Sequence, residues 1–230
     1  MPSLDSLKLQ FSSKIAQVTN GNPQNALSTV PAVVDLILDA IPSAIHSVAI
    51  TSVCVAALRD AGKASGVIGQ PGTLPRIDVV FSMDYKQVLP VMQFLSKNAS
   101  LQFNTLVEMT AVDYPERTNG RFEVTYVLFS PTHNMRITVK VMVDELTPVE
   151  SVTPVFKNAN WLERETWDMF GVFFLNHPDL RRLLTDYGFT HFPLRKDFPV
   201  QGYTEVAYSE ERKAITTRPV QLATAQRVVT

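Results

Sequence analysis

Three runs of alternating apolar and polar residues lie between residues 105 and 143, and they constrain the fold more than any other feature. In the middle run, every second position is apolar: Phe122, Val124, Tyr126 and Leu128. Successive side chains of a β-strand point to opposite faces of the sheet, so this period predicts strands with one buried face. Three such strands in succession predict a sheet covered by a second layer.

The residues before these runs supply covering helices and two further strands. Helices are predicted over residues 30–41 and 84–97, and strands over 47–58 and 76–81. The stretch 61–75 contains four glycines and two prolines, which is typical of a loop or a long hairpin connection. The order α-β-β-α-β-β-β predicts an α+β fold, a two-layer sandwich of a mixed sheet and helices.

Prolines refine both helix predictions. Pro31 suits the first turn of a helix, and Pro42 follows the end of the same helix. Pro90 predicts either a kink or a later start for the second helix, because proline lacks the backbone N–H that a helix interior uses.

The cysteine content excludes several kinds of redox site. Cys54 is the single cysteine of the chain, whereas an iron–sulfur cluster needs about four thiolates, or two thiolates with two histidines. Its apolar neighbours predict a small core residue, and a chain without a possible internal disulfide fits a reducing compartment. We therefore expect no cofactor, metal or catalytic site in this chain.

Charge and hydropathy exclude two further classes of partner. The net charge is −1 and there is no run of Lys and Arg, so nothing indicates binding to nucleic acid. No apolar run approaches the ~20 residues that span a bilayer. We expect no direct membrane span.

The chain divides into three parts. Residues 1–74 are predicted to form an N-terminal helical and strand extension with the first part of the α+β domain. Residues 75–171 complete that domain. Prolines, aromatics and charges mix without a sustained period in residues 172–230, which predicts an extended tail that binds other subunits. Aromatic residues and arginine are the types that anchor protein interfaces.

A helix over residues 160–171 closes the second part and has apolar groups on more than one side. Asn160 and Glu163 have the spacing of a capping box, and Gly171 suits the position after the last turn. At roughly 100° per residue, Glu165 projects into an apolar face of this helix. A buried carboxylate must be paired or protonated. The candidate partners of Glu165 are Arg181, Arg182 and Arg195.

Two interpretations of this acidic helix remain at this point. Glu163, Glu165, Asp168 and His177 could form a metal or acid–base site, and a free-standing hydrolase would use Glu165 and His177. Glu163 and Glu165 diverge by about 160° on a helix, however, so they cannot chelate one ion together. We favour an ion-pair network beneath the tail.

Several segments together resemble one known family. They are Glu163–Glu165, Asp168–Gly171, His177–Leu183 and Leu194–Pro199, preceded by Ala111–Pro115 and Arg121–Val124. Their order and spacing from about residue 75 to 222 are similar to the thirty-kilodalton subunit family of respiratory complex I, NADH:ubiquinone oxidoreductase. Residues 1–74 match poorly.

The resemblance implies a non-catalytic core subunit of the hydrophilic arm. The holoenzyme couples electron transfer from NADH to ubiquinone with proton pumping, and this family supports assembly of its quinone-reducing module. The expected partners are other subunits of the complex, especially the forty-nine-kilodalton subunit and neighbouring iron–sulfur subunits of the quinone module. FMN and iron–sulfur clusters are expected in the partner subunits. The tail is most similar to mitochondrial members, which implies the matrix side of the inner membrane; the alternative is the cytoplasmic face of a bacterial membrane.

The resemblance also suggests which residues have structural or interface roles. These residues lie in the motifs around the acidic helix and its downstream segment: Glu163, Arg164, Glu165, Trp167, Asp168, Gly171, His177, Arg181, Arg182, Arg195 and Asp197.

Overall fold

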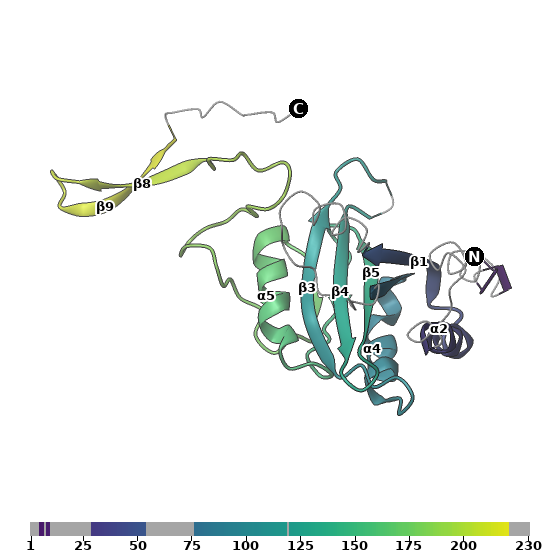
Figure 1. Ribbon diagram of the computed structural model, residues 1–230. Helices are drawn as coiled ribbons and strands as arrows, with labels where there is room; N and C mark the ends of the chain where they lie inside the picture. The colour runs from purple at the N-terminus through teal and green to yellow at the C-terminus, as the bar shows by residue number, and fades with distance from the viewer. Residues whose placement is uncertain (1–4, 7, 10–28, 54–75, 119, 221–230) are drawn as a thin grey trace, which may run out of the picture.

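A five-stranded sheet forms the centre of the protein (Figure 1). The computed structural model describes residues 5–6, 8–9, 29–53, 76–118 and 120–220. The sheet has the order β1-β2-β5-β4-β3. Its strands are β1 (Ile45–Val53), β2 (Arg76–Met83), β3 (Thr105–Asp113), β4 (Phe122–Ser130) and β5 (Met135–Val143).

The sheet is mixed, as predicted. The β2–β5 pair is parallel, whereas the β1–β2, β4–β5 and β3–β4 pairs are antiparallel. Phe122 pairs with Val143 and Leu128 pairs with Ile137, so the alternating apolar positions of β4 and β5 lie on the same face. This face is buried, and exposed positions of β3 lie on the other one.

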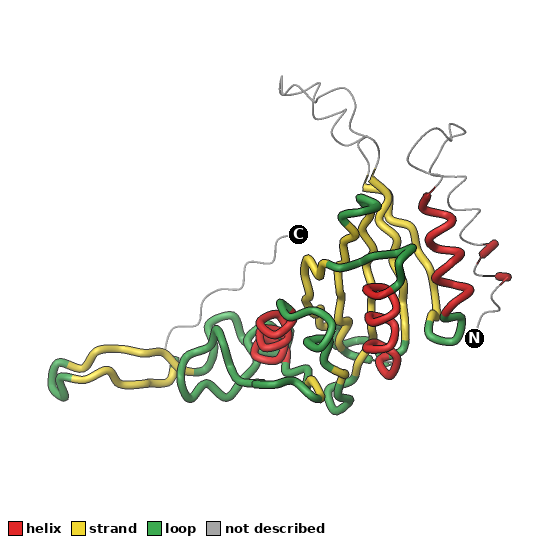
Figure 2. The backbone as a smooth tube through the Cα atoms, turned by 90° about the horizontal axis from the view of Figure 1, so that it is seen from below, coloured by secondary structure: helices red, strands yellow, loops and turns green. Residues whose placement is uncertain are grey.

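Helices cover the buried face, and Figure 2 shows them beside the sheet. They are α2 (Thr29–Ala40), the short 3₁₀ turn η1 (Tyr85–Gln87), α4 (Val88–Lys97) and α5 (Ala159–Phe170). Helix α4 contributes Val88, Val91, Met92 and Leu95 to the core shared with the sheet. Removing apolar surface from water contributes about 25 cal/mol per Å², which drives the two layers together. The predicted two-layer α+β sandwich is confirmed.

Element boundaries differ slightly from the prediction. Helix α2 begins at Thr29, and Ile41 and Pro42 follow its end. Helix α4 begins at Val88, so Pro90 lies in its first turn and causes the later start. Cys54, the rest of the strand predicted to residue 58 and the connection 61–75 lie outside the described residues.

Smaller elements follow the main sheet. Strands β6 (Val149–Glu150) and β7 (Phe174–Leu175) pair in parallel on either side of α5 in the sequence. Strands β8 (Thr204–Ser209) and β9 (Ala214–Pro219) form an antiparallel hairpin that projects away from the sheet (Figure 1). Among the described residues, no helix is long and apolar enough to cross a membrane.

Candidate functional site

Helix α5 is packed on two sides, as its sequence predicted. One side, with Ala159, Thr166 and Phe170, faces the core. The downstream segment 177–185 covers another side, where Arg164 and Asp168 are buried. The first part of the predicted tail therefore lies against this chain's own helix.

The N-terminal end of α5 differs from the predicted capping arrangement, whereas the C-terminal end agrees with it. Its N-cap is Asn158, whose side chain donates to the Leu106 carbonyl at 2.6 Å. Asn160 lies within the helix, so the predicted capping box with Glu163 is wrong. Gly171 ends the helix as predicted, with φ 83° and its N–H donating to the Trp167 carbonyl. A Cβ there would lie 2.5 Å from Arg195 Nη2.

Glu163 is fully buried and accepts hydrogen bonds from a neighbouring segment rather than from its own helix. Ser151 Oγ donates to Glu163 Oε2 at 2.6 Å, and the Val152 N–H donates to Oε1 at 2.8 Å. Burial raises the pKa of Glu163 to about 7, although both hydrogen bonds favour the ionised form. The side chain of Tyr126, also fully buried, lies close enough that the Glu163 charge adds to the effect of burial in raising the pKa of its phenol.

His177 lies beside Glu163. Its Nδ1 accepts the Asp179 N–H at 3.1 Å, which leaves the proton of the neutral ring on Nε2, 3.2 Å from the Asn160 carbonyl. Burial lowers the pKa of His177, so the neutral ring is favoured. Its Nε2 lies 3.8 Å from Glu163 Oε2.

Asp168 has the opposite environment on the same helix. Its Oδ2 accepts the N–H groups of Leu183, Leu184 and Thr185 at 2.8–3.0 Å. Its Oδ1 accepts from Thr185 Oγ1 at 2.7 Å and from Arg182 Nη1 at 3.0 Å. Burial alone would raise its pKa, but the hydrogen bonds from Thr185, Leu184 and Leu183 lower it to about 2.

Arginines hold the downstream segment against α5. Arg164 donates to the carbonyls of Arg181 and Arg182, and its guanidinium lies over the Trp161 ring. Arg182 also donates to the His191 carbonyl at 2.9 Å and lies 5.6 Å from the Trp167 ring centre. Arg181 itself is exposed and pairs with Asp179.

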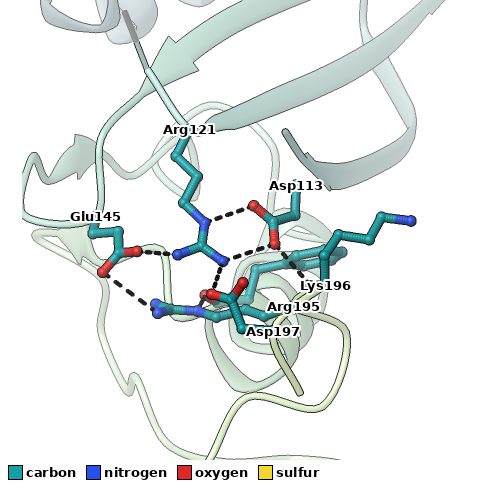
Figure 3. A network of polar contacts seen from close by, with 7 residues as sticks. Asp113, Arg121, Glu145, Arg195, Lys196 and Asp197 are labelled. Atoms are coloured by element: carbon teal, nitrogen blue, oxygen red, sulfur yellow. Dashed lines mark hydrogen bonds and ion pairs between the residues drawn. The ribbon is translucent and has the colours of Figure 1, made fainter. Parts of the chain in front are cut away.

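A second network fixes residues 195–197 to the sheet (Figure 3). Arg121 makes a bidentate pair with Asp113 at 2.7 and 3.0 Å, and it also pairs with Glu145 and Asp197. The Lys196 N–H donates to Asp113 Oδ2 at 2.8 Å. The hydrogen bond from Arg121 lowers the pKa of Asp113, despite the burial that opposes this. The pair is thus ionised at neutral pH.

Arg195 links this network to the end of α5. Its Nε donates to the Phe170 carbonyl at 2.6 Å, and its Nη1 lies 3.5 Å from Glu145 Oε2. The guanidinium also lies over the Phe122 and Phe192 rings. Because the arginine occupies the space beside Gly171, a side chain at that position would displace it.

One site prediction was wrong. Glu165 is exposed rather than buried on an apolar face, and Trp161 beside it is also exposed. The predicted partners meet other groups: Arg182 pairs with Asp168, and Arg195 with Glu145. The buried carboxylates of α5 are Glu163 and Asp168, so we predicted the right kind of network around the wrong residue.

The network around Arg121 was missed as a site, although its sequence signal was available. Asp113 and Arg121 both lie in segments that carried the family resemblance. Asp113 ends strand β3 and Arg121 directly precedes β4, and strand pairing brings them together because Asp113 lies opposite Phe122.

These residues have a structural role, because their charged groups hold segments of this chain together. The buried carboxylates accept hydrogen bonds from backbone and side-chain donors of this chain, and within the described residues no three His, Cys, Asp or Glu side chains converge as metal ligands. Glu165 is exposed while His177 is buried beside Glu163, so these two do not share a hydrolytic site.

Comparison with known proteins agrees with this class of structural site. Residues 81–204 match the family model of the respiratory-chain NADH dehydrogenase 30 kDa subunit. This match covers more than half of the chain. The chain belongs to that family.

Individual relatives come from mitochondria and bacteria. The chain is 59% identical over 140 residues to the mitochondrial NADH dehydrogenase [ubiquinone] iron-sulfur protein 3 of Candida albicans, covering 61% of this chain and 50% of that protein. It is 52% identical to NADH-ubiquinone oxidoreductase subunit 9 of Reclinomonas americana, over 59% of this chain and 66% of that protein. It is 49% identical to an NADH-quinone oxidoreductase subunit of Caulobacter vibrioides, over 70% of this chain and 80% of that protein. The chain thus spans about half the length of the Candida protein.

Proposed function

We propose that this chain is a non-catalytic structural subunit of the hydrophilic arm of mitochondrial complex I. In this role it supports assembly of the quinone-reducing module, on the matrix side of the inner membrane, by binding the forty-nine-kilodalton subunit and neighbouring iron–sulfur subunits. FMN and the clusters belong to those partners. Family membership supports the assignment to complex I, and the name of the Candida relative, which is described as mitochondrial, supports the location in the mitochondrion.

The projecting β8–β9 hairpin is the observation that carries the subunit-binding role. Val206 pairs with Thr217, and Tyr208 pairs with Ile215. Directly paired residues of antiparallel strands share a face, so these four side chains lie together. Val206, Tyr208 and Ile215 are 59%, 64% and 74% exposed. One face of the ribbon is therefore apolar and uncovered.

The opposite face of the hairpin is polar, and its side chains make an ion pair and a hydrogen bond across the two strands. Glu205 pairs with Arg218 across the strands, and Thr216 Oγ1 donates to the Ala207 carbonyl. An isolated two-stranded hairpin is at best marginally stable in water. Packing the apolar face against another subunit would stabilise the ribbon and remove its exposed apolar surface from solvent.

The base of the hairpin is anchored on the protein's own body. Tyr203 packs against His191 and Phe198, with ring centres 4.9 and 5.5 Å apart, and Phe198 packs on Phe189. Residues 177–198 thus form a fixed support, while the hairpin beyond it extends outward (Figure 1). This division suits a rigid arm that reaches a neighbouring subunit.

Incorporation into the complex tests the proposal. Cells would carry the triple change Val206→Ser, Tyr208→Ser and Ile215→Ser, and native gels would be probed for this chain. We expect the variant chain to be missing from the high-mass complex and from co-purification with the forty-nine-kilodalton subunit. Its melting temperature should remain near the wild-type value, because the hairpin contributes little to the core.

A matched control changes the polar face of the same ribbon. Ala207→Ser with Thr216→Ser preserves the register and the apolar face, so this variant should assemble normally. Normal assembly of the triple variant would contradict the role proposed for the hairpin. Absence of the wild-type chain from any NADH-oxidising complex would contradict the proposed function itself.

A further inference from the structure

Glu163 is a buried acid that no lysine or arginine neutralises within the described part of the chain. The groups facing it are Tyr126 from β4, Ser151 and Val152 after β6, and His177 after β7. Strand β3 also packs on α5, but its Glu108 is exposed and its Asp113 pairs with Arg121. His177 is neutral in its observed hydrogen bonds. The charges acting on that ring are Arg164 and Asp179, with opposite effects. An ionised carboxylate in such surroundings lacks a compensating charge.

A chain of hydroxyl groups leads from this acid toward the surface. Ser151 Oγ lies 2.6 Å from Glu163 Oε2 and 2.7 Å from Thr153 Oγ1. Thr153 is half-buried, whereas Glu163 and Ser151 are buried. The Thr153 N–H also donates to Ser151 Oγ at 3.2 Å. The hydrogen bonds therefore continue from the core to a partly exposed group.

This chain can be satisfied with Glu163 either protonated or ionised. In the protonated form, the carboxyl O–H donates to Ser151 Oγ, and the Ser151 hydroxyl donates to Thr153 Oγ1. In the ionised form, the Ser151 hydroxyl donates to the carboxylate, and the Thr153 hydroxyl donates to Ser151. A hydroxyl offers one donor and two acceptor sites, so both arrangements are allowed. Conversion of the first arrangement into the second transfers the carboxyl proton to Ser151 Oγ, the Ser151 proton to Thr153 Oγ1 and the Thr153 proton to solvent, so one proton leaves in total.

We propose that Glu163 is a proton-binding group that exchanges one proton with solvent through Ser151 and Thr153, and that its ionisation is coupled to His177. When the proton leaves, the new charge lies 3.8 Å from His177 Nε2. The charge then competes with the Asn160 carbonyl for the Nε2–H and favours the protonated ring. The loss of one proton from Glu163 thus acts on the residue that begins the segment packed on α5.

Infrared titration of the purified full-length chain tests this proposal, which does not depend on the role in complex I. The readout is the C=O stretch of a protonated carboxylic acid, followed from about pH 5.5 to 8.5, above the ordinary range of Glu near 4.3. We expect a band that disappears with a midpoint near 7. Glu163→Gln should abolish the titrating band, and Glu165→Gln, at an exposed position of the same helix, should retain it.

Two further variants separate the parts of the proposal. Ser151→Ala removes a hydrogen bond that favours the ionised acid, so the midpoint should rise; this variant also serves if Glu163→Gln does not fold. His177→Gln removes the coupled ring and should shift the midpoint. A midpoint near the ordinary Glu value, a titrating band that survives Glu163→Gln, or a midpoint unchanged in either Ser151→Ala or His177→Gln would overturn the proposal.

Discussion

Helix α5 holds two fully buried carboxylates whose surroundings are opposites. Asp168 accepts five hydrogen bonds, among them one from the cation of Arg182, and its pKa is lowered to about 2. Glu163 accepts two hydrogen bonds from neutral groups and faces a neutral histidine, and its pKa is raised to about 7. The same burial therefore favours charge at one end of the helix and a bound proton at the other.

The difference shows that burial alone does not determine the state of an acid. Desolvation raises the pKa of both groups, and the hydrogen bonds from Thr185, Leu184 and Leu183 outweigh it at Asp168, whereas the two hydrogen bonds to Glu163 do not. Three N–H groups converge on Asp168 because the loop 183–185 folds over the helix. The Asp168 hydrogen bonds thus hold residues 183–185 against α5. The Glu163 hydrogen bonds, by contrast, change when Glu163 gains or loses a proton.

The largest expected effect comes from removing the anionic partner of Arg182. Asp168→Ala leaves that cation and three backbone N–H groups without their acceptor, which costs about 3–5 kcal/mol in the free energy of unfolding. Chemical denaturation of the full chain at neutral pH measures the change. Glu163→Gln is the matched comparison and should cost clearly less, because the amide resembles the protonated acid. Equal losses in the free energy of unfolding in the two variants would show that the two buried acids do not differ in this way.

The pH dependence should have opposite signs at the two sites. The folded-state pKa of Glu163 lies above its unfolded value near 4.3, so its contribution is fully present below that value and falls as pH rises to about 7. The loss in the free energy of unfolding is about 4 kcal/mol at most, from 1.36 kcal/mol per pKa unit. Denaturation series over this range should show the decline in the wild type and its absence in Glu163→Gln. If Glu163→Gln retained the whole decline in the free energy of unfolding, other titrating groups would be its cause.

The titration of Asp168 should change the stability of the protein only at lower pH. Its folded-state pKa is about 2, below the unfolded value near 3.9, so its contribution is present above pH 3.9 and is lost as pH falls toward 2. Acid unfolding followed by circular dichroism should therefore begin at higher pH in Asp168→Asn than in the wild type. An identical acid transition in both proteins would show that the Asp168 hydrogen bonds do not control it.

Replacing Arg182 tests how much of the stabilisation by Asp168 depends on its one charged donor. Arg182→Met preserves apolar contact with Trp167 and Phe192 but removes one charged donor, while four other donors to Asp168 remain. A hydrogen bond to a charged group contributes about 1.5–3 kcal/mol, so the loss should be smaller than that of Asp168→Ala. Denaturation at neutral pH measures it. A larger loss would mean that Arg182 acts mainly through the His191 carbonyl and its ring contacts.

The smallest effect belongs to Glu165, which lies between the two buried acids. Glu165→Gln changes an exposed side chain, and such substitutions usually alter stability by less than about 0.5 kcal/mol. Its melting temperature should match that of the wild type from acid to neutral pH. A loss approaching that of Asp168→Ala would restore the buried role that the sequence had suggested.

The sheet was more predictable than the acidic helix for a physical reason. A strand with one covered face carries a period of two, which is visible at 122–128 and 137–143 without knowledge of any partner. The end of α5 was also local, since Gly171 can adopt a positive φ at little cost. The N-terminal end of α5 could not be predicted from local sequence, because the donors to Glu163 are Ser151 and Val152, which lie outside the helix.

The sequence by itself determined the order of elements, the α+β class and the set of charged residues that would form a network. Only the tertiary structure decided which carboxylates are buried. Helix α5 has apolar residues on several sides, so its own periodicity allows more than one buried face. Contact with the sheet and with residues 177–185 selects the faces of Glu163 and Asp168, and it leaves Glu165 in solvent. Local patterns follow from backbone geometry, whereas the pairing of a charge depends on which distant segment folds against it.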